Sequence, residues 1–508
     1  MTTTVTAVPR RLRWVVAVSS LAVALVVASM AALYTALPEI AADTGATQSQ
    51  LTWVIDGYTL ALACLVLPAG ALGDRYGRRL MLIGGLTVFA LASAAPLVVD
   101  GPVWLIVARS VAGAGAAAVM PSTLSILTSG LPEDRRSVAI GIWAGTVGGG
   151  AVLGILGSGL LMARWSWISI MLAMTIAGVV LAVAAYTIPE SSDSSRPPFD
   201  PWGAVSGATA IGLVTVAVLE APQRGWTDPA VLVMALAGVA AGAVFVVLER
   251  RATHPLLDVR LFAERGFSVG TISVAVQFLV SFGLFMLIVQ FFQLILGYRP
   301  LMSALAMAPM IVPMIALSLV APWLAQRFGL RLITTSGLAI VGAGVLSLAH
   351  LTAGSTFVDV LWPLLIMSVG LGLSAAPATA AIVEGVPADK HGVAAAVNDA
   401  AREVGAAVGI ALAGSILAAG YSHHIAAALP MLPEAVRDPV SSSLASALQV
   451  TEHMGPQAAP LAEFAETAFV HGLRQSCLVL GLFTIGVAIV LGFWAPGRRA
   501  AASSPTSG

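Results

Sequence analysis

Charged residues, lysine and cysteine are all scarce in this 508-residue chain, and each shortage excludes a class of protein. Only 10% of the residues are charged and 58% are hydrophobic, which excludes an ordinary soluble domain and is typical of a polytopic membrane protein. The single lysine, Lys390, and the lack of a G-x-x-x-x-G-K-[ST] sequence exclude a phosphate-binding loop, so ATP is not the fuel. A formal net charge of zero indicates no nucleic-acid partner.

Cysteine and histidine are too few and too scattered to build a reactive centre. The two cysteines, Cys64 and Cys477, fall within apolar runs, so we expect them to be small core residues. His423, His424 and His453 lack metal-ligand spacing, and we expect them to be solvated loop residues. The apolar runs hold no cluster of His, Cys, Asp and Glu at catalytic spacing. We therefore expect no enzyme activity, no metal and no cofactor.

The chain instead holds about fourteen apolar runs long enough to cross a bilayer. The first run is too long for the core of a signal peptide and is predicted to be an uncleaved helix. The runs cover 14–36, 51–72, 80–99, 103–128, 138–162, 166–188, 203–221, 230–248, 267–296, 302–325, 332–351, 359–383, 391–419 and 469–494. The alanine- and glycine-rich, arginine-rich composition favours a bacterial source, so we predict an all-α, multi-pass protein of the bacterial inner membrane.

The distribution of basic residues predicts the orientation. With the N-terminus inside, 18 of the 25 basic residues lie in cytoplasmic segments, five lie in outer segments, and Arg109 and Arg402 lie within helices. This bias holds only for an even number of helices with both termini cytoplasmic.

Three polar segments, which we expect to be non-helical, divide the chain. They are a serine- and proline-rich linker, a basic inner segment and a long acidic outer loop. The predicted parts are a cytoplasmic N-terminus (1–13), an N-terminal six-helix bundle (14–189), a cytoplasmic linker (190–202), two additional transmembrane helices (203–248), a cytoplasmic loop (249–266), a C-terminal six-helix bundle (267–494) with a long outer loop (420–467), and a disordered cytoplasmic tail (495–508).

Residues 70–79, which read GALGDRYGRR, join the second and third apolar runs. The glycines allow two helices to approach closely, and Asp74 is expected at the positive N-terminal end of the next helix, within reach of the arginines. Taken alone, the segment also fits any tight loop with positive charge inside. A degenerate copy, AQRFGLR, follows the tenth run at 325–331, with Gln326 in place of the aspartate. Two bundles carrying copies of one loop are typical of an alternating-access transporter.

Several ionisable residues fall inside the apolar runs, where a charge costs roughly 2.5–3.5 kcal/mol. Asp56 is expected either to bind a proton or a cationic substrate in a central cavity, or to reach back to the outer interface. Arg109 is expected either to control proton exchange by a neighbouring carboxylate, or to extend to the same interface.

The densest group of charges is Asp399, Arg402 and Glu403. On one helix the two carboxylates share a face, and neighbouring carboxylates in a low-dielectric environment suit proton exchange. The alternative is that 385–402 lies at the interface and only 404–419 is buried. Aromatic and methionine residues of the ninth and tenth runs are mostly packing residues, and a subset of them is a candidate apolar wall for substrate. They are Phe278, Phe282, Phe285, Met286, Phe291, Phe292, Met302, Met307, Met310 and Met314.

With these motifs, nearly the whole chain resembles the fourteen-helix drug/proton antiporters of the major facilitator superfamily. The resemblance implies a gating latch made by Gly70, Gly73, Asp74, Arg75, Gly77, Arg78 and Arg79. Arg109 opens a segment, with Gly113, Gly115 and Pro121, that is similar to the family's proton-linked arginine motif. Gly150, Gly154, Gly157 and Gly159 match the helix-packing antiporter motif, and residues 53–56 (WVID) are similar to those of quaternary-ammonium and dye efflux members.

Three positions depart from the family pattern. Ser29 replaces an aspartate often found on the first helix, Ala112 replaces a glutamine of the arginine motif, and Ile155 replaces the proline of the antiporter motif. The loss of the carboxylate argues against dicationic substrates, and the loss of the proline bears on the stiffness of the fifth helix.

The resemblance implies a proton-motive-force-driven exporter of amphipathic or cationic drugs or antibiotics, with coupling residues Asp56, Arg109, Asp399, Arg402 and Glu403. The expected partners are a small amphipathic substrate, protons and the lipid bilayer, with no nucleic acid, and the expected state is a monomer. Two alternatives stay open: an exporter dedicated to one endogenous metabolite or antibiotic, for self-resistance, and a non-transporting membrane sensor.

Overall fold

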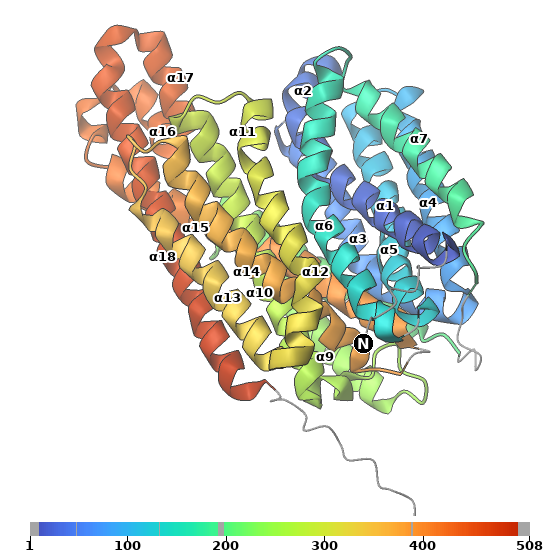
Figure 1. Ribbon diagram of the computed structural model, residues 1–508. Coiled ribbons are helices and arrows are strands. Elements are labelled where there is room, and N and C mark those ends of the chain that lie inside the picture. Colours follow the sequence, from blue (N-terminus) through green and yellow to red (C-terminus); the bar gives the residue numbers. More distant parts are fainter. Residues whose placement is uncertain (1–9, 47, 132, 191–197, 388–389, 496–508) are drawn as a thin grey trace, which may run out of the picture. The chain divides into compact units, whose positions relative to one another are not determined.

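The computed structural model describes residues 10–46, 48–131, 133–190, 198–387 and 390–495, and within these ranges it holds helices and no strand (Figure 1). Fourteen helices are long and apolar enough to cross a membrane, which confirms the count from the sequence. The start of the N-terminal segment, most of the 190–202 linker and nearly all of the C-terminal tail lie outside the described residues.

The membrane-spanning helices follow the predicted runs closely. They are α1 (Arg10–Ala32), α3 (Gln48–Tyr76), α4 (Arg78–Ala94), α5 (Pro102–Gly130), α6 (Glu133–Met162), α7 (Ile168–Ala185), α8 (Pro201–Arg224), α9 (Pro229–Arg251), α10 (Arg265–Gln290), α12 (Ile311–Phe328), α13 (Leu330–Ser347), α14 (Phe357–Glu384), α15 (His391–Ile425) and α18 (Ala459–Trp494). Shorter helices are α2 (Leu37–Thr44), α11 (Pro300–Met307), α16 (Glu434–Ser442) and α17 (Leu444–Met454).

The chain forms two compact units, each of which is assembled from separate stretches. The first contains Met1–Val216, Met234–Thr271 and Thr379–Ala401, and the second contains Ala217–Val233, Ile272–Ala378 and Arg402–Gly508. Helices α8, α9, α10, α14 and α15 therefore contribute to both units, and α15 changes unit between Ala401 and Arg402.

Glycine controls the packing of the first unit. Between lipid-embedded helices there is little hydrophobic driving force, so close van der Waals contact of backbones takes its place. A methyl group on Gly113 of α5 would collide with the carbonyl of Tyr58 on α3. On the other side of α5, a methyl on Gly115 would lie 2.7 Å from the carbonyl oxygen of Gly85 on α4. Small residues thus bring α3 and α4 against α5.

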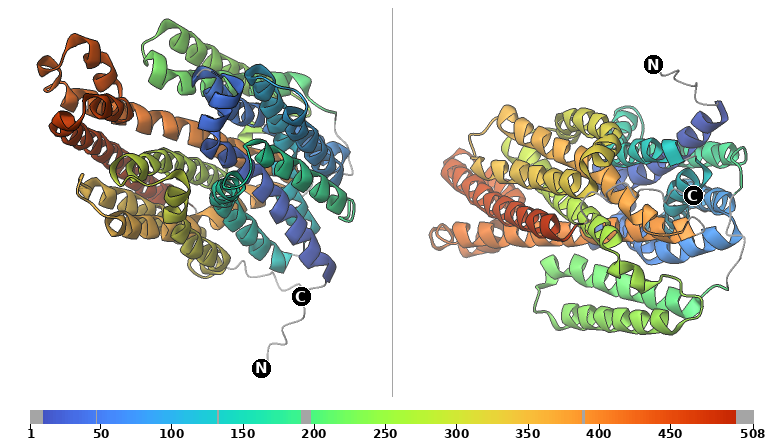
Figure 2. Two further views of the ribbon diagram at one scale, coloured as in Figure 1. Left: turned by 90° about the horizontal axis from the view of Figure 1, so that it is seen from above. Right: turned by 60° about the horizontal axis from the view of Figure 1, so that its bottom comes forward.

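The additional helices α8 and α9 run side by side in both views of Figure 2. Gly238 of α9 packs on Val214 of α8, and Phe245 packs over Gly207. A methyl on Gly212 would lie 2.8 Å from the Cys64 sulfur, which places α8 against α3. Large aliphatic residues of α9 such as Leu236 stay exposed, as expected of a helix that faces lipid.

In the second unit, α10 and α15 make a similarly close contact. Methyl groups on Gly405 and Gly409 of α15 would collide with the carbonyls of Ala275 and Leu279 on α10. Helix α13 packs against α18 through Gly481, whose nearest neighbour is the side chain of Leu346. A π-helical turn, Phe291–Ile295, ends α10, and Phe292 stacks on Tyr298 there at 5.8 Å.

The expectation that Gly420–Glu466 is non-helical is wrong. Helix α15 continues to Ile425, α16 and α17 follow, and α18 already begins at Ala459. The segment contains periodic apolar residues such as Leu444 and Ala447, which are buried. His424 is likewise not a solvated loop residue, because it is half-buried on α15 and stacks on Phe464 and His471 at about 5 Å.

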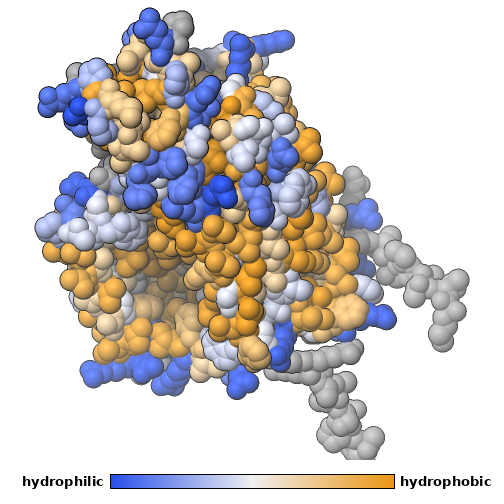
Figure 3. All heavy atoms as spheres, turned by 90° about the vertical axis from the view of Figure 1, so that its left-hand side faces the viewer, coloured by the Kyte–Doolittle hydropathy of each residue, from blue (hydrophilic) through white to orange (hydrophobic). Residues whose placement is uncertain are grey.

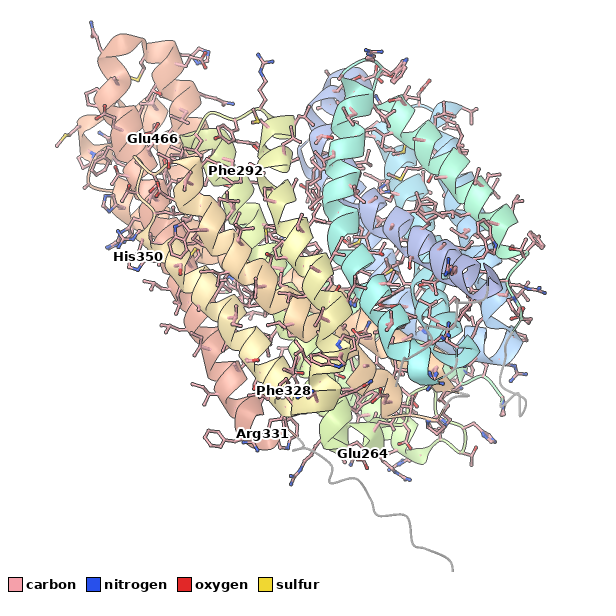
Figure 4. All side chains as sticks on the ribbon, in the orientation of Figure 1. Glu264, Phe292, Phe328, Arg331, His350 and Glu466 are labelled. Atoms are coloured by element: carbon pink, nitrogen blue, oxygen red, sulfur yellow. The ribbon has the colours of Figure 1, made fainter. Side chains whose placement is uncertain are left out.

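The surface pattern fits a membrane protein. Figure 3 shows a broad apolar area on one face, bounded above and below by hydrophilic residues. Figure 4 places Phe328 and Arg331 at one end of the second unit, and Phe292 and Glu466 toward the other. The repeated basic loop and the α16–α17 segment thus lie at opposite ends of this unit, as the positive-inside bias requires.

The backbone supports the internal repeat. Gly77 before α4 has φ 119° and ψ 129°, and Gly329 before α13 has φ 92° and ψ 148°. Both values lie in a region that L side chains rarely adopt, so each copy needs glycine at this position. The two copies of the segment therefore share an unusual glycine backbone conformation as well as a similar sequence.

We expect Gly154→Ala to destabilise the protein, because a methyl on Gly154 of α6 would collide with the backbone of Ala28 on α1. Overpacking of this kind costs about 1–3 kcal/mol. Gly157→Ala is the matched control on the same helix, because no atom lies within 4 Å of its added methyl. Thermal unfolding in detergent measures both, and equal midpoints for the two variants would contradict the close contact of α1 and α6.

Candidate functional site

The carboxylate of Asp74 lies at the first turn of α15, 318 residues away in the chain. Its Oδ1 accepts the backbone N–H of Gly392 at 3.0 Å, and its Oδ2 accepts that of Val393 at 3.1 Å. Arg78, one helical turn after Asp74, donates to Oδ1 from Nε at 2.9 Å and from Nη2 at 2.7 Å. The carboxylate therefore satisfies two free N–H groups of a helix start and one buried guanidinium at once.

Two glycines make this contact possible. A methyl on Gly392 would lie 2.5 Å from Asp74 Oδ1 and 2.6 Å from the carbonyl oxygen of Gly70. A methyl on Gly70 would lie 2.5 Å from the carbonyl oxygen of Gly392. The start of α15 thus rests directly on the backbone of α3.

Two expectations for residues 70–79 are corrected by the structure. The segment is not a ten-residue loop, because α3 continues to Tyr76 and α4 begins at Arg78. Asp74 does not cap α4, because Glu190 does so by accepting the backbone N–H groups of Arg79 and Leu80 at 3.0 and 3.2 Å. Asp74 is one turn too early on α3 to reach the start of α4, and its carboxylate points to α15 instead.

The other latch residues lie around this contact. Arg79 donates to the carbonyl of Ile188 at 3.1 Å and pairs with Glu190 at 3.6 Å. Arg75 lies over the ring of Tyr76 at 5.2 Å. Gly73 has ordinary contacts only, since an added methyl would meet Met81 and Ser122 no closer than 3.7 Å.

Arg109 is buried within the first unit, so the alternative that it extends to the interface is wrong. Its Nη1 donates to Ser29 Oγ at 2.8 Å, its Nη2 to the Ser29 carbonyl at 3.0 Å, and its Nε to the Val54 carbonyl at 3.3 Å. The guanidinium also lies 4.2 Å from the centre of the Tyr58 ring. The residue that departs from the family aspartate is therefore the main partner of this arginine, and every acceptor is neutral.

Asp56 lies near this group but is not the hydrogen-bond partner of Arg109. Its side chain is half-buried on α3, and both Asp56 and Arg109 lie within electrostatic range of Tyr34. The structure thus brings together Arg109, Ser29 and Tyr58, and leaves Asp56 beside them.

Helix α15 is continuous from His391 to Ile425, and residues before 404 such as Ala395 and Asn398 are buried, so the alternative that only 404–419 is buried is wrong. In the first unit, Asp399 is fully buried and accepts from the Asn398 amide at 3.3 Å, and Asn398 accepts from Thr379 Oγ1 at 3.1 Å. In the second unit, Arg402 and Glu403 are also buried. The four polar residues 398, 399, 402 and 403 are therefore inside the protein.

An aromatic ladder runs along α10 in the second unit. Phe278 stacks on Phe282 at 5.7 Å, and Phe285 lies 6.4 Å from Phe282. All three rings are half-buried, and the Arg402 guanidinium lies 5.0 Å from the Phe278 ring. Met286 continues the row and faces Gly414 of α15, where an added methyl would lie 3.3 Å from the Met286 methyl. Of the ten aromatic and methionine residues, Phe278 thus lies beside Arg402, and Phe282, Phe285 and Met286 continue from it along α10.

Comparison with known proteins identifies the family. The model of the Major Facilitator Superfamily matches residues 19–410. The chain belongs to the Major Facilitator Superfamily.

Relatives within this superfamily agree over the full length. The multidrug efflux pump LfrA of Mycolicibacterium smegmatis is 31% identical over 493 residues, which cover 97% of this chain and 98% of LfrA. The multidrug resistance protein Stp of Mycobacterium tuberculosis is 31% identical over 481 residues, which cover 91% of this chain and 88% of Stp. This superfamily member is thus a multi-pass efflux transporter of the bacterial inner membrane, and it is not an enzyme.

A solved structure supports the fold. The human organic anion transporter MFSD10 matches with a TM-score of 0.61 at 13% identity, covering 96% of this chain and 100% of that chain. At this identity the likeness concerns the major facilitator fold alone.

Some residues of the site were missed at the sequence level. Gly392 and Glu190 lie in polar segments next to helix ends, and nothing local marks them as partners of residues 74–80. The pair Gly405 and Gly409 has the G-x-x-x-G spacing that favours close helix contact, and this spacing could have predicted the contact with α10.

We expect Ser29→Ala to lower the free energy of unfolding by about 1.5–3 kcal/mol, because it removes an acceptor from a buried cation. Ser19→Ala on the same helix is the matched control. The Ser19 hydroxyl is buried without a hydrogen-bond partner among the described residues, so its removal breaks no hydrogen bond and is not expected to lower the free energy of unfolding in this way. Thermal unfolding in detergent compares the variants, and an equal effect of both would contradict the role of Ser29.

Proposed function

We propose that this transporter exchanges protons for amphipathic organic compounds, with Asp74 and its neighbours as a latch on the cytoplasmic side. One observation carries the proposal. A single helix, α15, begins at the Asp74 carboxylate and holds the buried acids Asp399 and Glu403 two to three turns further on. A change in the charge of these acids acts on the same helix that the latch holds.

The latch role of Asp74 follows from its hydrogen bonds. Release of α15 leaves the backbone N–H groups of Gly392 and Val393 without their acceptor and leaves the buried Asp74 carboxylate with Arg78 alone, so opening costs several kcal/mol unless water or another group replaces these contacts. A contact of this strength holds one state of the transporter and still breaks on the time scale of transport. Arg75 and Arg79, with Gly70, Gly73 and Gly77, position the two helices.

The coupling role is proposed for the buried charges. A carboxylate in a low-dielectric interior favours its neutral form unless a cation or hydrogen-bond donors stabilise the charge. Asp399 and Glu403 are therefore the proposed proton carriers, and Arg402 is the group that responds to their charge. Asp56, beside the buried Arg109, is a second proposed carrier.

The substrate class follows from the α10 ladder together with the multidrug names of LfrA and Stp. Half-buried stacked rings and a flexible methionine offer contacts to flat apolar molecules of varied shape without requiring one hydrogen-bond pattern. We propose that Phe278, Phe282, Phe285 and Met286 form the apolar wall of the substrate site.

The test of proton coupling is ethidium efflux from energised cells, with and without a protonophore. We expect the protonophore to lower the efflux rate about tenfold or more, because it collapses the proton gradient. Asp74→Asn and Glu403→Gln are expected to have an effect of about the same size, since each replaces a buried acid and tenfold corresponds to 1.4 kcal/mol. Glu220→Gln is the control, because Glu220 forms an exposed i,i+4 pair with Arg224.

Other outcomes of the efflux experiment would favour one of the alternative functions. Efflux that the protonophore does not affect would contradict antiport. No ethidium movement, with the protein present in the membrane, would favour an exporter dedicated to one metabolite or antibiotic. If no compound tried causes a proton flux when it is added, a non-transporting membrane sensor would be favoured.

The test of the substrate wall is Phe282→Ala. Loss of one aromatic contact of about 0.5–1.5 kcal/mol is expected to raise the KM for ethidium about two- to tenfold. Phe483→Ala on α18 is the control, because Phe483 is exposed on the outside of the unit. An unchanged KM in Phe282→Ala would remove this residue from the proposed wall.

A further inference from the structure

Glu249 is a buried acid that the proposed transport mechanism does not use. It lies near the end of α9, one of the two additional helices, and only 3% of its surface is exposed. The positive-inside bias assigns this end of α9 to the cytoplasmic side. Acids are almost never fully buried unless a partner stabilises them, so the surroundings of Glu249 require an explanation.

The two oxygens of Glu249 have different surroundings. Oε2 accepts the backbone N–H of Leu257 at 3.1 Å, which ties the segment after α9 back onto the helix. Oε1 is buried and has no hydrogen-bond partner among the described residues. The backbone N–H of Leu256 also stabilises the carboxylate, but within the described residues no donor makes a hydrogen bond to Oε1 itself.

Oε1 points at the start of α8, where Asp200 lies. A methyl on Gly203 would collide with Glu249 Oε1 and would lie 2.8 Å from Asp200 Oδ2. Both oxygens are thus within 2.8 Å of one point, so at most 5.6 Å, twice that distance, separates them. Asp200 Oδ1 is occupied, since it accepts the N–H groups of Trp202 and Gly203 at 3.0 and 2.9 Å. Oδ2 is the oxygen left to face Glu249.

Within the part of the chain that the structure describes, no basic side chain pairs with either acid. Asp200 and Asp258 act on Glu249 electrostatically, and both are acids. Asp258 is half-buried and uses Oδ1 to accept the N–H of Arg260. The remaining charged or titratable residues of the adjoining segments are exposed: Arg250, Arg251, His254, Arg260, Glu264 and Arg265.

We infer that Glu249 and Asp200 form a proton-binding pair on the additional helices, separate from the latch and from the α15 acids. Glu249 is the protonated member, and its Oε1–H donates to Asp200 Oδ2 after a small side-chain rotation. One proton on Glu249 Oε1 gives this oxygen a hydrogen bond. The same proton removes the free-energy cost of burying a carboxylate opposite another acid.

The exchange of this proton needs only water and the two acids. Asp200 is half-buried, so it gives the pair a connection to the aqueous side. On deprotonation the proton passes from Glu249 Oε1 to water through Asp200, and two carboxylates then face each other across Gly203. Their repulsion would loosen the contact between the start of α8 and the end of α9.

The test is infrared spectroscopy of the full-length protein in lipid at neutral pH, in water and in D₂O. We expect a carbonyl band of a protonated carboxylic acid that Glu249→Gln lacks, because glutamine keeps the shape and removes the acid. Glu220→Gln at the other end of α8 is the matched control and is expected to keep the band, since Glu220 pairs with Arg224. Asp200→Asn is expected to shift the frequency of the band, because it replaces the proposed acceptor.

Each outcome decides the proposal. A spectrum of Glu249→Gln equal to that of wild type would overturn it, because Glu249 would then be ionised in the wild type. A band that disappears on addition of sodium or potassium ions would overturn it in favour of a cation between the acids. If Glu249→Gln does not fold, Asp200→Asn carries the test, and an unshifted band in that variant overturns the pair.

Discussion

The attraction between one carboxylate and the first turn of one helix organises much of this protein. The free N–H groups at the start of a helix carry about half a positive charge, and burial strengthens their attraction to an anion. Asp74 meets α15 in this way, and Arg78 stabilises the same oxygen. A second carboxylate, Glu190, repeats the arrangement at the start of α4. An acid within residues 70–79 therefore holds the start of α15, and an acid from elsewhere in the chain, Glu190, holds the start of α4.

Close backbone contact is the condition for these polar interactions. Gly70 and Gly392 leave no space for a methyl, and the same holds for Gly113 against Tyr58. A larger residue at any of these positions would push the helices apart and lengthen the hydrogen bonds of Asp74 or Arg109. In a bilayer, where water does not replace a lost partner, such lengthening costs more than it does at a protein surface. These glycines therefore keep the hydrogen bonds of Asp74 and Arg109 short, in addition to allowing the helices to pack closely.

The fold was predictable from the sequence to within a few residues at most helix ends, because fourteen long apolar runs and the distribution of arginine depend on local composition alone. The partner of Asp74 was not predictable. The sequence indicates that an acid near a helix end accepts backbone N–H groups, but it does not indicate which helix supplies them, and the start of α4 is nearer in the chain than the start of α15. The helices between residues 425 and 459 were missed because their polar composition resembles that of a loop. Ser29 was noticed as a departure from the family, but its bond to Arg109 depends on the crossing of α1 and α5, which no local pattern encodes. The coupling roles of Asp56, Arg109, Asp399, Arg402 and Glu403 stay predictions.

The hydrogen bonds of Arg109 to neutral acceptors have an electrical consequence. The hydroxyl, carbonyl groups and aromatic ring that contact this guanidinium do not neutralise its charge, whereas an aspartate at position 29 would pair with it directly. An elementary charge that crosses a membrane potential of 100 mV gains or loses about 2.3 kcal/mol. Any displacement of Arg109 along the field during switching therefore makes the balance between the two states depend on voltage. In this transporter a serine in place of an aspartate would allow the membrane potential to act on the conformational change directly, alongside the proton gradient.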